Sequence, residues 1–154
     1  SISLYAVAIA GALGAESVDY CDVDPDRLAL AAELGANAIE GPPNGRLGSY
    51  PITVDGSASR AGLTCACRST EPGGECTSVG VLFEPDTPMP LLEMYTRGVH
   101  FHIGRAMARP VIPDILELVA AGRLHPEKVT SAVVRWDDAP EALREPHSKL
   151  VIER

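Results

Sequence analysis

The chain has 154 residues, of which 45% are hydrophobic and 22% are charged, so it is large enough to fold around a core of its own. The net charge is -8 and the Lys and Arg residues form no stripe, which excludes nucleic acid and anionic membranes as expected partners. No apolar run reaches the roughly 20 residues that span a bilayer, and the four cysteines are few for this length, so we expect a cytoplasmic protein.

Residues 1–15, SISLYAVAIAGALGA, are almost entirely apolar. They predict a helix over about residues 4–13, with Ser1 or Ser3 as its N-cap and Gly14 at its C-terminal end. A signal peptide is the alternative, but a positively charged leader is lacking and a charged strand-turn-helix pattern follows at once. We therefore expect a helix that is buried on most of its sides.

The next residues alternate between strand and helix patterns. Residues 17–21 predict a strand that ends on Asp22, and Asp24-Pro25 then begins a helix that runs to Leu34. Further elements are expected as strands at residues 37–40, 51–55 and 76–83, a helix from Ser57 or Ser59 to Arg68, and a turn at residues 71–74. This alternation predicts an α/β fold in which a doubly wound parallel sheet carries helices on both faces.

The second half begins with a proline-rich loop, residues 84–90, and continues with shorter elements. We expect helices at residues 91–95, 110–121 and 137–144, and strands at residues 99–104, 130–136 and 149–153. The strand, helix and strand over residues 130–136, 137–144 and 149–153 predict a small α+β appendage to the parallel sheet. We therefore expect two units, a partial nucleotide-binding domain over residues 1–125 and an appendage over residues 126–154.

Asp22 is the first candidate site residue, because it is an acid at the end of a strand. A strand-final acid about 20 residues after a glycine-rich turn holds the ribose hydroxyls of NAD in dinucleotide-binding units. Here the acid is present, while the glycine-rich turn and the strand before it are not, which predicts that the sequence starts inside a nucleotide-binding fold. The alternative for Asp22 is a structural acid that caps the next helix or its turn, beside Asp24.

Several segments of the sequence are weak signals one by one, but their order and spacing together are specific for one protein family. They are VDYCDVDPDRLALAAELGA, then VDGSAS, then Pro-Gly-Gly followed by SVGV, then LLEMYTRGVHFHIG, and finally WDDAPEALR with a terminal KLVIER. Together they resemble the C-terminal, cofactor-binding half of a medium-chain dehydrogenase of the zinc-dependent alcohol dehydrogenase family. The resemblance covers essentially the whole chain. It implies a Rossmann-like sheet without its first strand, cut within the family's glycine-rich motif, and it assigns residues 126–154 to the catalytic domain of the parent enzyme.

The resemblance also implies a set of NAD contacts. Asp22 matches the acid that binds both adenosine-ribose hydroxyls, which favours NAD over NADP because a 2′-phosphate would meet a carboxylate. Arg27 matches a basic position beside that ribose, and Ser3 stands where the motif has its last glycine. Lys149 falls where the family often has an arginine that reaches the pyrophosphate, with a solvated surface lysine as the alternative. The full implied set is Ser1, Ile2 and Ser3 at the helix start, Asp22 and Arg27 at the ribose, Gly56 and Ser57 at the cofactor edge, Val79, Gly80 and Val81 at the nicotinamide pocket, and Lys149.

The catalytic and structural zinc sites of the resembled family lie in its N-terminal half. The intact parent is thus expected to transfer hydride between an alcohol or polyol and NAD, whereas this chain alone is expected to hold no catalytic residue, to be inactive and to bind NAD weakly or not at all. In the doubly wound strand order the missing strand is the central one, so residues 17–21 and 51–55 should have no shared neighbour.

Two other functions remain as alternatives. One is a non-catalytic association module built on a nucleotide-binding fold. The other is a methyltransferase, which also uses a strand-final acid for a ribose, but the order of elements after Phe83 does not suit it.

The candidate ligands for a tetrahedral metal site are Cys65, Cys67, Cys76, His100 and His102. Cys65 and Cys67 are two residues apart on a predicted helix, so their side chains diverge by about 200°, and we expect no metal site. The two histidines share one face of a strand, which allows a ligand pair, simple exposure or an interface. In the resembled family this strand pairs with its twin across a two-fold axis, which implies a homodimer through Val99 to Gly104.

Overall fold

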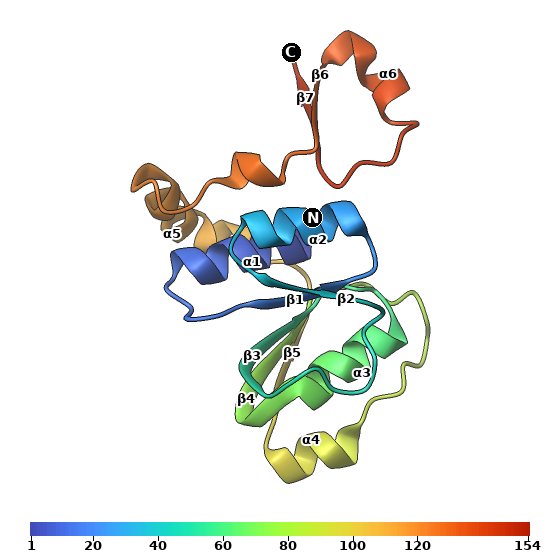
Figure 1. The fold of residues 1–154 in the computed structure, drawn as a ribbon. Helices are drawn as coiled ribbons and strands as arrows, with labels where there is room; N and C mark the ends of the chain where they lie inside the picture. Colours follow the sequence, from blue (N-terminus) through green and yellow to red (C-terminus); the bar gives the residue numbers. More distant parts are fainter.

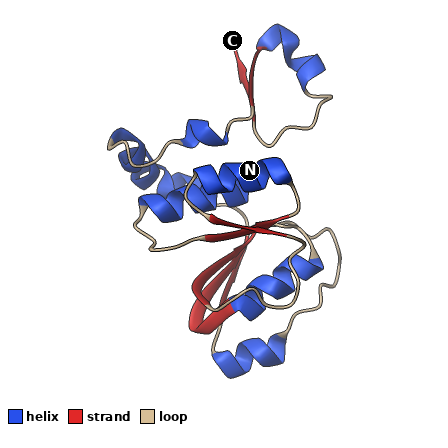
Figure 2. Cartoon of the chain, in the orientation of Figure 1, coloured by secondary structure: helices blue, strands red, loops and turns tan.

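Parallel strands with helices on two sides form the body of the protein in the computed structural model, which describes residues 1–154 (Figures 1 and 2). Helices α1 and α2 lie on one side of the strands, and α3 and α4 lie on the other. The helices are α1 Ile2–Ala12, α2 Pro25–Glu33, α3 Arg60–Ser69, α4 Leu91–Arg97, α5 Ala108–Ala120 and α6 Ala139–Ala142, with two 3-10 helices, η1 Pro126–Val129 and η2 Trp136–Asp138. The strands are β1 Asp19–Asp22, β2 Asn37–Glu40, β3 Tyr50–Asp55, β4 Thr70–Ser78, β5 His100–Ile103, β6 Ala132–Arg135 and β7 Leu150–Glu153.

The strands form three separate parallel sheets. β1 pairs with β2, β4 lies between β3 and β5, and β6 pairs with β7. No backbone ladder joins β1 to β3, although the Tyr50 hydroxyl at the start of β3 donates to Asp19 Oδ2 on β1 at 2.6 Å. The predicted α/β class with a parallel sheet is confirmed. The expectation that β1 and β3 share no neighbouring strand is confirmed as well.

Side-chain caps set the starts of two helices close to the predicted positions. Asp24 accepts a hydrogen bond from Arg27 N at 3.0 Å, and Pro25 takes the first helical position of α2. Ser59 accepts from Gly62 N at 3.0 Å and begins α3. Each cap satisfies a backbone N–H that has no partner inside its helix. The loops that follow β1 and β3 therefore end at defined points.

Helix α1 is less buried than its composition predicts. Only Leu4 and Val7 are buried, whereas Ile2 is 57% exposed and Leu13, at the C-cap, is 66% exposed. The helix contacts α2, η1 and the start of the sheet, and most of its other residues are only half-buried, so the expectation of burial on most sides is wrong. Ser1 occupies the N-cap position, but its side chain makes no capping bond. No helix of the chain has the length and hydropathy that a membrane span requires.

Strand β4 ends earlier than the strand predicted at residues 76–83. Its last residue, Ser78, lies opposite Asp55, the last residue of β3, and opposite Ile103, the last residue of β5. Neither β3 nor β5 continues beyond this point, and only the backbone oxygen of Asp55 still accepts hydrogen bonds, from Val79 N and Gly80 N, so the ladder stops. The prediction is corrected for three implied site residues, which follow the strand instead of belonging to it: Val79, Gly80 and Val81.

The expected turn at residues 71–74 lies inside β4 as a bulge. The pairing of β3 with β4 moves from Tyr50 opposite Thr70 to Ile52 opposite Glu75, so more residues of β4 than of β3 fill the same length. The turn residues were thus identified correctly, but they interrupt a strand and do not precede it.

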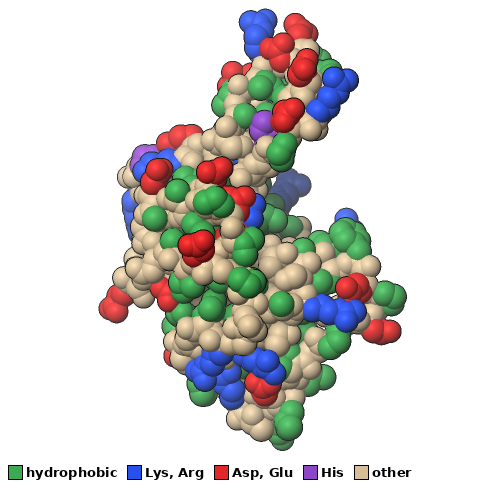
Figure 3. Space-filling model, turned by 45° about the vertical axis from the view of Figure 1, so that its right-hand side comes forward, with side chains coloured by type: hydrophobic (Ala, Val, Ile, Leu, Met, Phe, Trp, Pro, Cys, Tyr) green, Lys and Arg blue, Asp and Glu red, His purple; other side chains and the backbone are tan.

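The strands β6 and β7 form, with α6, a lobe that projects from the rest of the molecule (Figures 1 and 3). Side chains of both charges gather on this lobe in the view of Figure 3. Just before the lobe, Val129 in η1 is fully buried against the cluster under α1. The division of the chain at residue 125 stays a prediction.

Candidate functional site

The start of α1 and the loops after β3 and β4 meet at the carboxyl end of the parallel strands. The Ser3 hydroxyl fills the space that a Cβ on Gly56 would need, and that Cβ would lie 3.7 Å from Val79 Cγ2. A Cβ on Gly80 would lie 2.6 Å from the backbone nitrogen of Ala58. Four of the implied cofactor residues, Ser3, Gly56, Val79 and Gly80, are therefore brought together, in an arrangement that requires glycine at position 80, where the Cβ would meet backbone.

Asp55, the last residue of β3, joins the loop after β3 to the loop after β4. Its backbone oxygen accepts from Val79 N at 2.8 Å and from Gly80 N at 3.1 Å. Its carboxylate accepts from Ser57 N at 3.0 Å, from Ser57 Oγ at 2.7 Å and from Ser78 Oγ at 3.2 Å. The side chain is buried. Asp55 thus ties the two loops to each other, so that Gly56 and Ser57 remain exposed at the surface.

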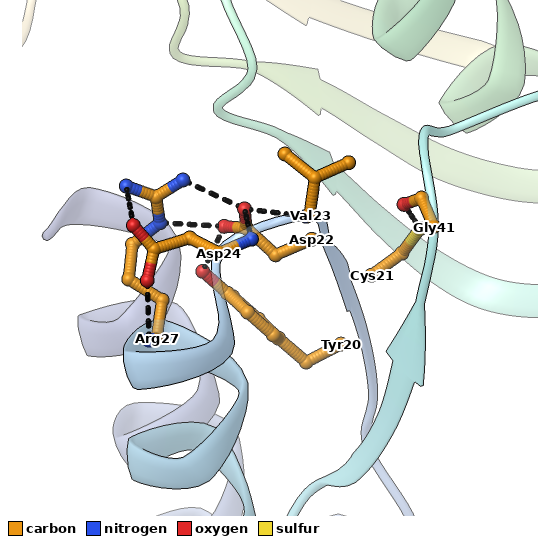
Figure 4. A network of polar contacts seen from close by, with 7 residues as sticks. All are labelled: Tyr20, Cys21, Asp22, Val23, Asp24, Arg27 and Gly41. Carbon is orange, nitrogen blue, oxygen red and sulfur yellow. Dashed lines mark hydrogen bonds and ion pairs between the residues drawn. The ribbon is translucent and has the colours of Figure 1, made fainter.

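Asp22 forms the second part of the site, at the end of β1 (Figure 4). Arg27 on α2 donates to both of its oxygens, through Nε at 2.8 Å and Nη2 at 2.7 Å. The Tyr20 hydroxyl donates to Oδ2 at 2.8 Å, and the backbone N–H groups of Val23 and Asp24 donate to Oδ1. Asp22 therefore carries the turn contacts of a structural acid and also faces the basic residue implied for a ribose site.

The charges in this network are well defined. The hydrogen bonds from Arg27 hold the pKa of Asp22 well below its usual range, although burial opposes them. Burial raises the pKa of Tyr20 well above its usual value, and the hydrogen bond to Asp22 adds to this. The carboxyl group is consequently ionised at neutral pH, and the phenol keeps its proton and donates it.

The remaining implied residues lie around this edge without joining the two networks. Ser1 and Ile2 are exposed at the start of α1. Burial and the charge of Arg27 lower the pKa of the Ser1 amino group, and the charge of Lys149 acts in the same direction. The Lys149 side chain is exposed and makes no ion pair, and Val81 is 60% exposed beyond β4.

Two residues that the sequence did not single out are central to this edge, Tyr20 and Asp55. Asp55, like Asp22, is an acid at the end of a strand, and glycine and serine follow it. A comparison of the two strand ends could therefore have found Asp55 from the sequence. Tyr20 gave no such signal, because its distance of two residues from Asp22 matters only once the strand is seen to place both side chains on one face.

The cysteines and histidines do not form a metal cluster. No three His, Cys, Asp or Glu side chains come close enough to hold an ion. Cys67 and Cys76 are buried with their sulfur atoms 3.9 Å apart, and the hydrogen bond to Cys76 raises the pKa of the Cys67 thiol. His100 and His102 are exposed on β5, and His102 pairs with Glu75 on the neighbouring strand.

Comparisons with known proteins identify relatives of this chain. No protein-family model matches the sequence. A probable zinc-binding alcohol dehydrogenase from Mycobacterium tuberculosis is 26% identical over 147 residues, which cover 90% of this chain and 38% of that protein. Alcohol dehydrogenase TADH from Thermus sp. ATN1 is 30% identical, with a TM-score of 0.85, and the match covers 99% of this chain and 49% of that one.

A further solved structure shares the fold at low sequence identity. An alcohol dehydrogenase from Escherichia coli CFT073, solved in complex with NADH, is 16% identical and has a TM-score of 0.84 over 99% of this chain and 49% of its own. The chain thus spans about half the length, or less, of the relatives that it matches.

Proposed function

Because the chain is related over nearly all of its length to zinc-type alcohol dehydrogenases, we propose that it is their cofactor-binding portion and that it binds NAD. The relation confirms the resemblance found in the sequence motifs. The activity of a whole dehydrogenase, its substrate and its partners belong to the proposal, since the chain spans only part of these relatives.

The observation that carries the proposal is the convergence of strand ends at one edge. In open α/β sheets, ligands bind outside the carboxyl ends of the parallel strands. At this edge Gly56 and Gly80 carry no side chain, and the first N–H groups of α1, which have no partner inside the helix and no side-chain cap, suit a pyrophosphate. Asp22 lies at the end of β1 with an ionised carboxylate that suits a ribose diol. The residues present therefore fit a dinucleotide.

The charge of Asp22 favours NAD over NADP. A carboxylate accepts hydrogen bonds from the two ribose hydroxyls, whereas the 2′-phosphate of NADP would place a second negative charge against it. Arg27 reduces this repulsion, but its guanidinium is already paired with Asp22 and lies 3.2 Å from Asp24. The net charge close to the ribose position is therefore negative.

Replacing Asp22 with asparagine tests the proposal. We expect Asp22→Asn to weaken NAD binding about 10- to 100-fold and to remove the preference over NADP, as measured by calorimetry or by ligand-observed NMR. Asp19→Asn is the matched control, because Asp19 is a hydrogen-bonded acid at the other end of the same strand. Tighter binding of NADP than of NAD by the unaltered chain would contradict the proposal.

For the whole protein we propose hydride transfer between an alcohol or polyol and NAD. Zinc would polarise the alcohol oxygen in such a reaction. Since this chain brings no three potential zinc ligands together, we assign the metal to the part of the relatives that the chain does not span. This chain would orient the nicotinamide through the segment after β4 and hold the adenosine through Asp22.

We also propose a homodimer through β5. This strand is the edge of the β3-β4-β5 sheet, its outer backbone groups are unpaired, and Ile103 at its end is 71% exposed. An unpaired edge strand offers hydrogen-bonding groups to a second copy. We expect sedimentation equilibrium to show a dimer and Ile103→Asp, which places a charge on the exposed end of this edge strand, to shift it to monomer. A monomer at all accessible concentrations would contradict this part of the proposal, while a dimer without nucleotide binding would favour an association module.

A further inference from the structure

Cys67 and Cys76 face each other inside the protein. Cys67 lies in the last turn of α3, and Cys76 lies in β4, the central strand of the β3-β4-β5 sheet. Their sulfur atoms are 3.9 Å apart, and the two residues are 1% and 0% exposed. Both thiols are free, and the site proposed for the nucleotide uses neither of them. The pair is therefore a nucleophilic group to which the nucleotide site gives no role.

The surroundings of the pair leave each sulfur atom one thiol neighbour. The other members of the cluster around the pair are Leu63 and Met94, which are buried, and Ala66, Leu82, Met89, Val99 and Phe101, which are half-buried. The sulfur of Cys65 contacts Ser69 Oγ instead, at 4.0 Å. The thiol of Cys21 donates to the backbone oxygen of Gly41 at 3.3 Å. The fold thus pairs Cys67 with Cys76 and keeps the other two cysteines apart from them.

The two thiols differ in acidity. The hydrogen bond from Cys67 lowers the pKa of Cys76, although burial opposes it, and the hydroxyl groups of Thr53 and Thr70 act in the same direction as Cys67. The hydrogen bond to Cys76 raises the pKa of Cys67. The thiolate is the nucleophilic form of cysteine. Cys76 is consequently the sulfur that reacts first, and Cys67 keeps its proton.

We propose that Cys67 and Cys76 are an oxidative modification site, at which hydrogen peroxide forms a reversible disulfide that joins α3 to β4. The inference is independent of the proposed nucleotide binding. In a disulfide the two sulfur atoms lie about 2.05 Å apart, so the present distance of 3.9 Å must shorten. Rotation of the two side chains and a small approach of α3 to the sheet provide this change.

The reaction proceeds in two steps. The Cys76 thiolate attacks one oxygen of the peroxide, the O–O bond breaks, and the hydroxide that leaves takes up a proton to form water, so that Cys76 becomes a sulfenic acid. The sulfur of Cys67 then attacks the sulfur of Cys76, the S–O bond breaks, and the second hydroxide leaves as water with the proton of Cys67. Two electrons pass from the sulfur atoms to the peroxide.

Helix α4 covers the pair and controls access to it. α4 contacts α3 and β4, and its residue Met94, which is 8% exposed, packs in the cluster around the two sulfur atoms (Figure 1). A short helix of seven residues opens locally more often than the whole chain unfolds. Peroxide is small and uncharged, so it reaches the pair during such openings. The rate of oxidation should therefore depend on how well α4 packs.

Oxidation of the full chain tests the proposal. After treatment with excess hydrogen peroxide, the remaining thiols are alkylated in denaturant and the tryptic peptides are analysed by mass spectrometry. We expect the peptide of residues 61–68 to be joined to that of residues 69–97, and dithiothreitol to separate them. The thermal unfolding midpoint of the oxidised chain should fall by roughly 5 °C when dithiothreitol is added, because the bridge restricts the unfolded chain.

Two alanine substitutions identify the sulfur atom on α3, since the peptide of residues 61–68 contains both Cys65 and Cys67. Cys67→Ala should abolish the bridge and leave Cys76 as a sulfenic acid that dimedone captures. Cys65→Ala is the matched control, because Cys65 is 2% exposed on the same helix, and the yield of the bridge should stay unchanged.

The substitution Met94→Ala tests the route of access. It weakens the packing of α4 over the pair, and we expect the bridge to form at least about threefold faster than in the unaltered chain. Leu92→Ala on the same helix is the control, since Leu92 is 75% exposed and its loss should leave the rate unchanged. Equal rates in the two variants would overturn the route through α4.

Three results would overturn the modification site itself. The first is a chain in which Met107, which is 78% exposed, is fully oxidised while no bridge joins the two peptides. The second is a bridge that persists in Cys67→Ala, because it would then belong to Cys65. The third is an oxidised chain whose unfolding midpoint rises on addition of dithiothreitol, which would show that the fold does not accommodate the bond.

Discussion

Leu4→Ala is expected to lower the free energy of unfolding by about 3 kcal/mol, as measured by urea denaturation followed by circular dichroism. Leu4 is 0% exposed and lies where α1 contacts α2, β1 and η1. Alanine would leave a cavity that these elements cannot fill, because each is held by its own hydrogen bonds. A large part of the stability of a chain of this size depends on such a contact.

Leu13→Ala, at the C-cap of the same helix, is the matched control. Leu13 is 66% exposed, so the same substitution should change the free energy of unfolding by less than about 0.5 kcal/mol. Equal losses at Leu4 and Leu13 would show that α1 does not pack as described. The cluster around Leu4 also contains the ring of Tyr20, so Leu4→Ala should in addition loosen the network at Asp22.

The part of the site that depends on local sequence could be predicted. Asp22, Asp24 and Pro25 form a strand end, a cap and a helix start within a few residues, and neighbouring residues alone determine these features. The same holds for Ser59, which caps α3 as expected. Short-range rules suffice where a hydrogen bond joins residues two or three positions apart.

Features that depend on distant partners could not be predicted. The end of β4 at Ser78 follows from the lengths of β3 and β5, which no local pattern in β4 reveals. The partial exposure of α1 follows from which elements cover it, while its composition alone predicts burial. The role of Asp55 is of the same kind, because it joins the loop after β3 to the loop after β4. In each case the missing information was the position of an element distant in the sequence.

Gly80→Ala is expected to destabilise the junction of the two loops at the cofactor edge. The new Cβ would lie 2.6 Å from the backbone nitrogen of Ala58 and 3.0 Å from its Cα, so backbone atoms must move. Ala58 already has a positive φ of 51°, and its neighbour Ser57 is held by hydrogen bonds to Asp55. The loop after β3 therefore cannot move away without breaking these contacts.

The loop after β4 cannot yield instead, because the N–H groups of Val79 and Gly80 are both bonded to the backbone oxygen of Asp55. We expect Gly80→Ala to cost about 2 to 3 kcal/mol in the free energy of unfolding, and NAD binding, if the proposal holds, to weaken together with it. Gly104→Ala is the control, since a Cβ on Gly104 meets no atom within 4 Å and should cost almost nothing. A Gly80→Ala chain as stable as the Gly104→Ala chain would mean that the two loops are not in contact, and the convergence of strand ends on which the nucleotide site depends would be lost with that contact.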